Sequence, residues 1–167
     1  MKSSHETRYF ITIATKNYDS YFGVIIKGKM LRNPMGEYAL CAWERSAIEQ
    51  NDSTFDAFVV MPNHIHGIVR IHNQAPITAA GWLSERSPDM LSPVIDRYKI
   101  VIKEWCHECG YTDFDWEPHY YARLIRRESE LRHMHRYIQE NPIHWHSDRY
   151  NKNNVIDSVR ARYMASA

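Results

Sequence analysis

Two β-forming runs near the middle of the sequence constrain the fold more than any other feature. Residues 55–61 (FDAFVVM) and 65–71 (IHGIVRI) are rich in the β-branched and aromatic side chains that favour strands. Only Pro62-Asn63 and its neighbours separate them. The sequence therefore predicts a β-hairpin at this point of the chain.

Other segments show the periodicities of strands and helices. Residues 9–15 and 119–125 mix aromatic and β-branched side chains, which predicts two further strands. Apolar residues at intervals of three and four predict three helices, over residues 38–50, 91–109 and 128–141. The order β, α, β, β, α, β, α favours an α+β fold, with helices packed on a mainly antiparallel sheet.

Turn-forming residues mark the expected boundaries. Residues 33–36 (NPMG) read as a turn, and Gly110 is placed to end the second helix. Pro142 closes the third helix, because the residue before a proline disfavours the α conformation. Residues 73–88 read as a loop, and residues 155–164 as a short helix.

Length and charge bound the function. A chain of 167 residues, 44% hydrophobic, suits one domain over residues 1–167, with a core of about 9–148 and a tail over 149–167. A net charge of +1 gives no global basic field, so a nucleic-acid partner would have to meet a local patch. No apolar stretch approaches the ~20 residues that span a bilayer, so we expect a cytoplasmic protein with no membrane partner.

Ten histidines are many for this length, and two of them begin the second strand of the hairpin. His64 and His66 are two residues apart, so their imidazoles project from one face of the strand. The apolar neighbours Ile65 and Ile68 indicate a position where a core strand would more simply carry Val or Ile. The pair predicts a two-nitrogen site that faces something polar.

The last predicted helix carries a second polar pair. Tyr137 and Asn141 are four residues apart and share one helix face, beside its apolar stripe. If the stripe packs on the sheet, both side chains reach its edge, where His64 and His66 also point. Two imidazoles and a carboxamide oxygen suit a divalent cation such as Mg²⁺ or Mn²⁺ with positions open for substrate oxygens.

Both segments resemble motifs of a known family. Residues 61–69 (MPNHIHGIV) resemble the HUH motif (His, hydrophobic, His) of single-tyrosine HUH transposases. Residues 136–142 (RYIQENP) resemble the Tyr-Ile-x-x-Asn-Pro motif of their REP-associated tyrosine transposase branch. The similarity runs from about residue 9 to about residue 148, and the two motifs together are more specific than either one.

The resemblance implies a ferredoxin-like or RRM-like sheet with the HUH strand at its centre. It further implies cleavage of single-stranded or hairpin DNA through a 5′-phosphotyrosine link, with Tyr137 as the nucleophile. His64, His66 and Asn141 would be the metal ligands. Family members differ in whether the tyrosine comes from the same chain or from a dimer partner, so a homodimer and a monomer both stay open. One departure is Ala122-Arg123, where an acidic or histidine side chain is expected in the strand before the tyrosine helix.

A local basic patch is expected to track the DNA phosphates. Its candidate residues lie around the tyrosine helix and on the second helix, and are Arg123, Arg126, Arg127, Arg132, Arg136, Lys99 and Lys103. Tyr120, Tyr121 or Trp82 would stack on bases. The simpler interpretation of these cations is a solvated surface.

Structural interpretations compete with the functional ones elsewhere. Paired strand histidines are more often exposed or hydrogen-bonded than metal-bound, Tyr137 alone would be a core residue, and Asn141 would only end its helix. Residues 106–109 (CHEC) offer half of a zinc site without a second pair, and the three cysteines are expected to be reduced. The other grouped histidines are expected to be solvated or to pack the tail: His133, His135, His144 and His146.

Three functions are consistent with these observations. The first is a DNA strand transferase that uses Tyr137. The second is a domesticated module that binds structured DNA or RNA without cutting, and the third is a metal-dependent phosphodiesterase that uses water. They differ in whether a covalent protein–DNA adduct forms and in whether it depends on Tyr137.

Overall fold

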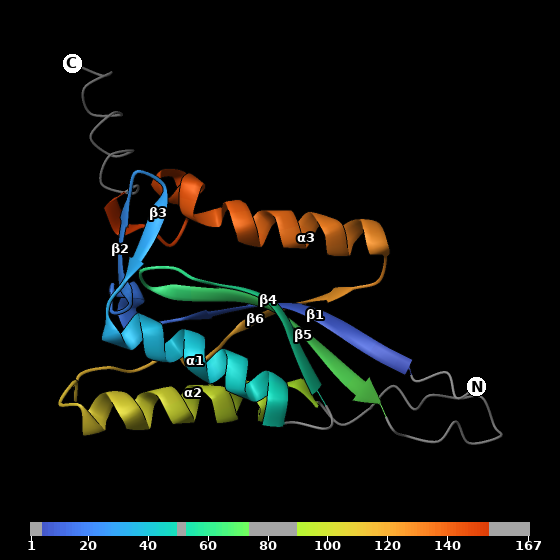
Figure 1. Cartoon of the computed structure of the whole chain (residues 1–167), viewed down its shortest axis with the longest axis horizontal. Coiled ribbons are helices and arrows are strands. Elements are labelled where there is room, and N and C mark those ends of the chain that lie inside the picture. Colours follow the sequence, from blue (N-terminus) through green and yellow to red (C-terminus); the bar gives the residue numbers. More distant parts are fainter. Residues whose placement is uncertain (1–4, 50–52, 74–89, 154–167) are drawn as a thin grey trace, which may run out of the picture.

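Four strands form an antiparallel sheet at the centre of the computed structural model, which describes residues 5–49, 53–73 and 90–153 (Figure 1). They are β1 (His5–Ala14), β4 (Ser53–Val60), β5 (His64–Asn73) and β6 (Tyr121–Ile125), in the spatial order β4-β5-β1-β6. β4 and β5 pair as the predicted hairpin, and β1 pairs with both β5 and β6. The predicted α+β sheet is confirmed, with the two histidines on a central strand.

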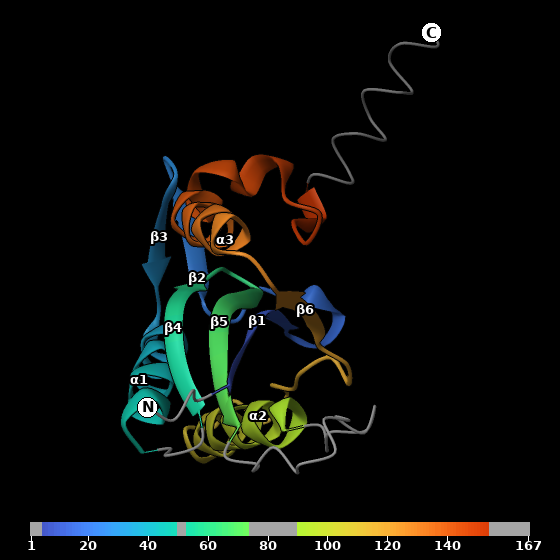
Figure 2. The same ribbon diagram turned by 90° about the vertical axis from the view of Figure 1, so that its right-hand side faces the viewer.

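Helices cover both faces of this sheet (Figure 2). α1 (Pro34–Glu49) and α2 (Leu91–Glu108) pack on one face, and α3 (Glu128–Glu140) crosses the other. With α1 between β1 and β4 and α2 between β5 and β6, the strand order is that of a ferredoxin-like fold. The three helices are the predicted ones, and no bound differs from its prediction by more than four residues.

Alternation along the strands divides the core in two. Ile11 and Ile65 belong to the large apolar cluster beneath α1 and α2. Phe10 and Ile68 belong to a smaller cluster, which the apolar stripe of α3 completes with Leu131, Met134 and Ile138. His64 and His66 have the same strand parity as Ile68, so they lie on the α3 face, in line with the prediction.

The turn expected at residues 33–36 is instead the start of α1. Pro34 is the first residue of the helix, and the Asn33 side-chain oxygen accepts a hydrogen bond of 3.0 Å from the Gly36 backbone N–H. An asparagine N-cap followed by proline at the first helical position has the same composition as a turn. The prediction was wrong because both structures use these residues.

A second hairpin was not predicted. β2 (Gly23–Ile26) and β3 (Lys29–Arg32) form a separate two-stranded sheet that rises from the start of α1 toward the end of α3 (Figure 1). Lys27 and Gly28 between them both have positive φ, 51° and 73°, as a two-residue hairpin turn requires. The hairpin is hard to predict because Lys27 at the first turn position is a weak turn signal and because neither strand has a buried side chain.

The chain stays helical beyond α3. Asn141 has φ −54° and ψ −42°, the α conformation, although Pro142 follows it. A 3-10 helix, η2 (Asn141–Ser147), then turns the chain back toward the sheet. Pro142 ends the α-helical hydrogen bonding as predicted, but it does not end the helical course.

Some expectations fall elsewhere in the chain. The helix predicted over residues 155–164, most of the loop at 73–88 and Trp82 lie outside the described residues. Gly110 ends α2 as predicted, with φ 90°. No helix in the described ranges has both the length and the apolar character needed to cross a bilayer.

Candidate active site

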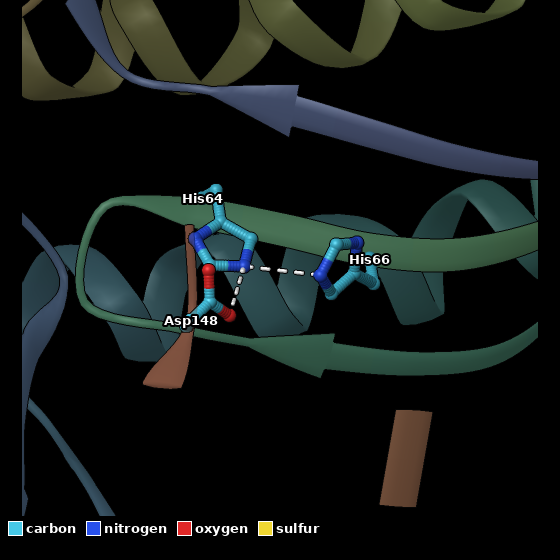
Figure 3. A group of neighbouring side chains, drawn as sticks. All are labelled: His64, His66 and Asp148. Atoms are coloured by element: carbon cyan, nitrogen blue, oxygen red, sulfur yellow. Dashed lines mark hydrogen bonds and ion pairs between the residues drawn. The ribbon is translucent and has the colours of Figure 1, made fainter. Parts of the chain in front are cut away.

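The two motif histidines meet at the start of β5, close to the turn that joins it to β4 (Figure 3). Both are buried, and their Nε2 atoms lie 3.1 Å apart. Two nitrogen ligands at about 2.1 Å from a cation and at right angles to each other would be about 3.0 Å apart. The pair therefore has the spacing of two adjacent ligands of one metal ion.

Neighbouring side chains hold the outer nitrogen of each ring. Asn63 Oδ1 lies 2.9 Å from His64 Nδ1 and can only accept, so Nδ1 carries the proton and Nε2 presents a lone pair. Thr12, directly opposite His66 in the β1–β5 register, places its hydroxyl 2.8 Å from His66 Nδ1. Such contacts orient imidazole ligands and set their tautomer.

Burial keeps both rings uncharged. Desolvation, with added repulsion from His66 and Arg149, lowers the pKa of His64 well below its ordinary value. Desolvation, reinforced by Arg149, lowers the pKa of His66 to about 3. At neutral pH both imidazoles are thus in the neutral form that binds metal ions.

Asp148, which follows η2, is a third group at this site. Its Oδ2 lies 3.7 Å from His64 Nε2, and the ligand atoms of His64, His66 and Asp148 all lie within 4.8 Å of one another (Figure 3). Burial raises the pKa of the Asp148 carboxyl. The three side chains form a candidate His-His-Asp metal site.

The sequence did not single out Asp148, because it lies beyond a helical turn whose direction no periodicity reveals. It is an acidic side chain at a site where the family resemblance leads one to expect such a group from the strand before α3. That strand has Ala122-Arg123 instead. The carboxylate thus comes from the segment that follows the tyrosine helix in the sequence, and not from the strand that precedes it.

Asn141 is the predicted ligand with an unusual environment. It is 3% exposed, and its Oδ1 has no hydrogen-bond partner in the described part of the chain. Leaving a buried acceptor unpaired is costly, so such an atom calls for a ligand. The donor set of two imidazoles, a carboxylate and a free carboxamide oxygen fits a divalent cation.

Tyr137 lies at the mouth of this site. Its ring centroid is 5.3 Å from that of His66 and 5.8 Å from that of Phe10, and 42% of the residue is exposed. Partial burial raises the pKa of its phenol, and a hydrogen bond with the Asn141 side chain lowers it. The predicted juxtaposition of Tyr137 with the histidine pair is present within one chain.

The segment after η2 closes the site from the other side. Tyr150 packs its ring against His64, with centroids 4.6 Å apart, and Asn63 Nδ2 donates 2.7 Å to the Tyr150 carbonyl. Arg149 donates 2.6 Å to the Tyr150 hydroxyl. The sequence predicts a tail from residue 149 onward. In the structure Tyr150 contacts His64, and Arg149 contacts Tyr150.

The predicted cations are divided between the two faces of the sheet. Lys99 and Lys103 are on α2, opposite the histidines, where Lys99 donates to the Glu117 carbonyl at 2.9 Å and Lys103 pairs with Asp115 at 2.9 Å. The arginines are exposed around β6 and α3, and are Arg123, Arg126, Arg127, Arg132 and Arg136. The structure therefore separates the two lysines from the site.

Among those arginines, Arg123 shares the side of Tyr137. Arg123 pairs with Phe10 across the β1–β6 ladder, so its side chain is on the α3 face. An α-helix turns about 100° per residue. Arg132 and Arg136 therefore lie more than 90° around α3 from Tyr137, on another face of the helix. His135, on their flank, faces Asp56 of β4 at 3.5 Å.

The remaining candidates are peripheral. Tyr121 is 47% exposed and, opposite Thr12 in the register, on the α3 face, whereas the Tyr120 hydroxyl lies 2.8 Å from Ser92 of α2. His133, His144 and His146 are exposed. Cys106 is buried and Cys109 exposed, both as free thiols, as expected for reduced cysteines.

Comparison with known proteins agrees with this geometry. No family model matches the sequence. An uncharacterised protein of Haemophilus influenzae is 32% identical over 148 residues, which cover 84% of this chain and 82% of that protein. The REP-associated tyrosine transposase of Escherichia coli K12 is 28% identical over 88 residues, covering 53% of this chain and 43% of that protein.

Over about half of its length the chain is thus similar to a REP-associated tyrosine transposase. Its fold is also that of a solved REP-associated tyrosine transposase bound to a REP hairpin, with TM-score 0.55, 19% identity and coverage of 86% of this chain and 71% of that one. A candidate transposase from Deinococcus radiodurans R1 matches with TM-score 0.51, 16% identity and coverage of 83% and 93%. These two structural matches show that the fold is shared over most of this chain.

Proposed function

We propose that the protein cleaves single-stranded DNA and rejoins it through a 5′-phosphotyrosine intermediate, with Tyr137 as the nucleophile. The observation that carries the proposal is the exposed phenol of Tyr137 beside a buried, neutral histidine pair. A tyrosine needed only for packing would not be 42% exposed at the rim of a set of metal-type ligands.

His64, His66 and Asn141 would hold a divalent cation, Mg²⁺ or Mn²⁺, with Asp148 as a further oxygen ligand. The bound cation would polarise a phosphate oxygen and neutralise charge that develops at phosphorus. The protein would position these ligands. Asn63 and Thr12 orient the two rings, and η2 has Asn141 at its start and Asp148 directly after its end.

The reaction is a transesterification. The Tyr137 hydroxyl oxygen bonds to phosphorus, the bond from phosphorus to the DNA 3′ oxygen breaks, and the phenolic proton leaves through solvent while the 3′ oxygen gains one. The phosphotyrosine retains the energy of the broken bond, so a 3′-OH can reverse the step without ATP.

Hairpin DNA is the favoured substrate class. The solved relative is bound to a REP hairpin. On this chain, exposed Tyr121 and Arg123 lie on the site face of the edge strand β6, opposite Thr12 and Phe10 of β1. An exposed aromatic ring and a guanidinium suit stacking on an unpaired base and pairing with a phosphate.

The test is covalent capture. The protein is incubated with Mn²⁺ and a set of single-stranded hairpins taken from the inverted repeats around its coding region, labelled at the 3′ end because that fragment stays on the tyrosine, and then resolved under denaturing conditions. We expect a labelled adduct that EDTA and Tyr137→Phe abolish. Cleavage that survives Tyr137→Phe would indicate a phosphodiesterase that uses water, and EDTA-resistant binding without cleavage would indicate a binding module.

A further inference from the structure

Arg149 lies at the mouth of the site with its charge held by aromatic rings. Its guanidinium carbon is 4.7 Å from the ring centroid of Tyr150 and 5.9 Å from that of Tyr121. One of its terminal nitrogens donates 2.6 Å to the Tyr150 hydroxyl. These contacts place a planar cation between the strand edge and the segment that closes the histidine pair.

No carboxylate within the described ranges forms a salt bridge with this guanidinium. Some other cations are paired with carboxylates: Arg70 with Asp56, Arg127 with Glu130 and Lys103 with Asp115. Arg149 is exposed and donates a hydrogen bond to Tyr150, and a guanidinium has five N–H groups to donate. Stacking thus fixes its orientation and leaves most of its donors open, with the neighbouring Asp148 carboxylate within electrostatic range.

The surroundings of Arg149 define what it can bind. Tyr150, on which the guanidinium stacks, packs against His64 with ring centroids 4.6 Å apart. The positive charge of Arg149 also favours lower pKa values for Tyr137, His64 and His66. A guanidinium fork matches two oxygens of a phosphate. Arg149 is exposed whereas His64 and His66 are buried, so an anion in solvent can reach this cation without entering the histidine pair.

We propose that Arg149 binds the DNA phosphate that Tyr137 attacks. The inference rests on the proposed function and adds a residue to it from a segment that neither motif contains. As the Tyr137 oxygen bonds to phosphorus and the bond to the 3′ oxygen breaks, the non-bridging oxygens gain negative charge, and the guanidinium is in place to donate to them. Tyr121 and Tyr150 keep the fork from rotating away.

A binding experiment without chemistry tests the contact by itself. The probe is fluorescein-labelled dT15 in EDTA, titrated with Tyr137→Phe protein that carries Arg149→Gln, Arg149→Lys or Arg97→Gln. Arg97 is exposed on α2, on the opposite face, and serves as the matched loss of one charge. Loss of one phosphate contact should lower the slope of log affinity against log salt by about 0.7.

We expect that slope change for Arg149→Gln alone. Arg149→Lys should keep the slope of the protein with Arg149 intact, because lysine keeps the positive charge. Equal affinity of the Arg149→Gln and Arg97→Gln proteins, or no binding of dT15 at low salt by the protein with Arg149 intact, would overturn the proposal. A thermal melt of each variant shows whether lost binding reflects lost folding, and rescue by lysine separates a charge contact from packing of Tyr150.

A second experiment uses an oligonucleotide on which the wild-type protein forms the covalent adduct. At saturating DNA, Arg149→Gln should slow adduct formation about 10- to 100-fold, and Arg149→Lys should recover part of that rate because it lacks the fork. A neutral methylphosphonate at the cleaved position should shrink the difference between wild type and Arg149→Gln to within about threefold.

The two experiments fail in distinguishable ways. If no oligonucleotide gives an adduct, the proposed function fails, and the dT15 titration still decides whether Arg149 contacts phosphate. If wild type forms the adduct and Arg149→Gln forms it at the same rate, Arg149 is a packing residue and the inference fails alone.

Discussion

The Nε2 atoms of His64 and His66 face each other at 3.1 Å because Asn63 and Thr12 hold the Nδ1 atoms behind them. Thr12 is the residue of β1 opposite His66 in the sheet register, so the ring is positioned by the sheet itself. This outer contact makes the spacing of the pair a property of the strands rather than of a bound ion.

We predict that Thr12→Val lowers the affinity for Mn²⁺ by about tenfold or more, the usual cost of losing a contact behind a metal ligand. Valine keeps the shape of threonine and removes only the hydroxyl. Isothermal titration with Mn²⁺ measures the change, and Thr12→Ser, which keeps the hydroxyl, should stay near wild type. Equal affinities for the valine and serine variants would show that the hydroxyl does not orient His66.

Asn141 leads to a prediction in which stability and binding change in opposite directions. Its Oδ1 is buried without a partner, so the metal-free protein bears the desolvation cost of that oxygen. Leucine also removes the hydrogen bond of the amide with Tyr137, but water can replace it at this exposed phenol. We therefore expect Asn141→Leu to raise the free energy of unfolding in EDTA by about 1 kcal/mol and to weaken Mn²⁺ binding at least tenfold. Urea unfolding in EDTA and Mn²⁺ titration are the two measurements.

The matched control is Asn151, a second buried asparagine. Its Nδ2 donates 2.9 Å to the Trp145 carbonyl and its Oδ1 accepts 3.1 Å from the Asn153 backbone. Because these bonds would be lost, Asn151→Leu should destabilise the protein. If Asn141→Leu also destabilises it and leaves Mn²⁺ binding intact, Asn141 serves to end its helix and is not a ligand.

The division of the cations predicts which of them DNA contacts. Arg123 is exposed on the α3 face, whereas Lys103 pairs with Asp115 on the other side of the sheet. Arg123→Gln should weaken dT15 binding and lower its salt slope by about 0.7, measured by fluorescence anisotropy. Lys103→Gln should change the affinity less than twofold by the same measurement. A slope lowered equally by both variants would mean that DNA also tracks α2.

Periodicity explains what could be predicted from sequence. A strand repeats every two residues, so His64 and His66 had to share a face, and a helix turns 100° per residue, so Tyr137 had to lie near Asn141. Packing α3 on the sheet then brought Tyr137 beside His66, as the structure shows. These relations depend only on secondary structure and on one apolar stripe.

The rest of the site comes from segments without a period. Asp148, Arg149 and Tyr150 follow a 3-10 helix that begins at a pre-proline residue in the α conformation, so their direction depends on tertiary contacts such as that of Asn63 with the Tyr150 carbonyl. The prediction that groups Lys103 with the arginines is wrong because the sequence does not tell which face of the sheet its helix, α2, covers.

Gly67 directly follows His66 and faces the opposite side of the sheet, where the indole of Trp43 lies against the backbone. A Cβ at this position would be 2.3 Å and 2.5 Å from two ring carbons of Trp43. The indole is itself held by stacking on Phe58, with centroids 4.4 Å apart, so it cannot yield freely. The glycine after the histidine pair is therefore required by packing under the site.

We predict that Gly67→Ala lowers the free energy of unfolding by about 1–3 kcal/mol, the cost of overpacking a core, and weakens Mn²⁺ binding as β5 shifts. Trp43→Leu removes the atoms that clash but leaves a cavity. Because the two residues touch, the double variant should lose at least about 0.5 kcal/mol less than the sum of the single losses. Urea unfolding of the four proteins measures this coupling, and strictly additive losses would mean that the alanine is accommodated by strand movement away from Trp43.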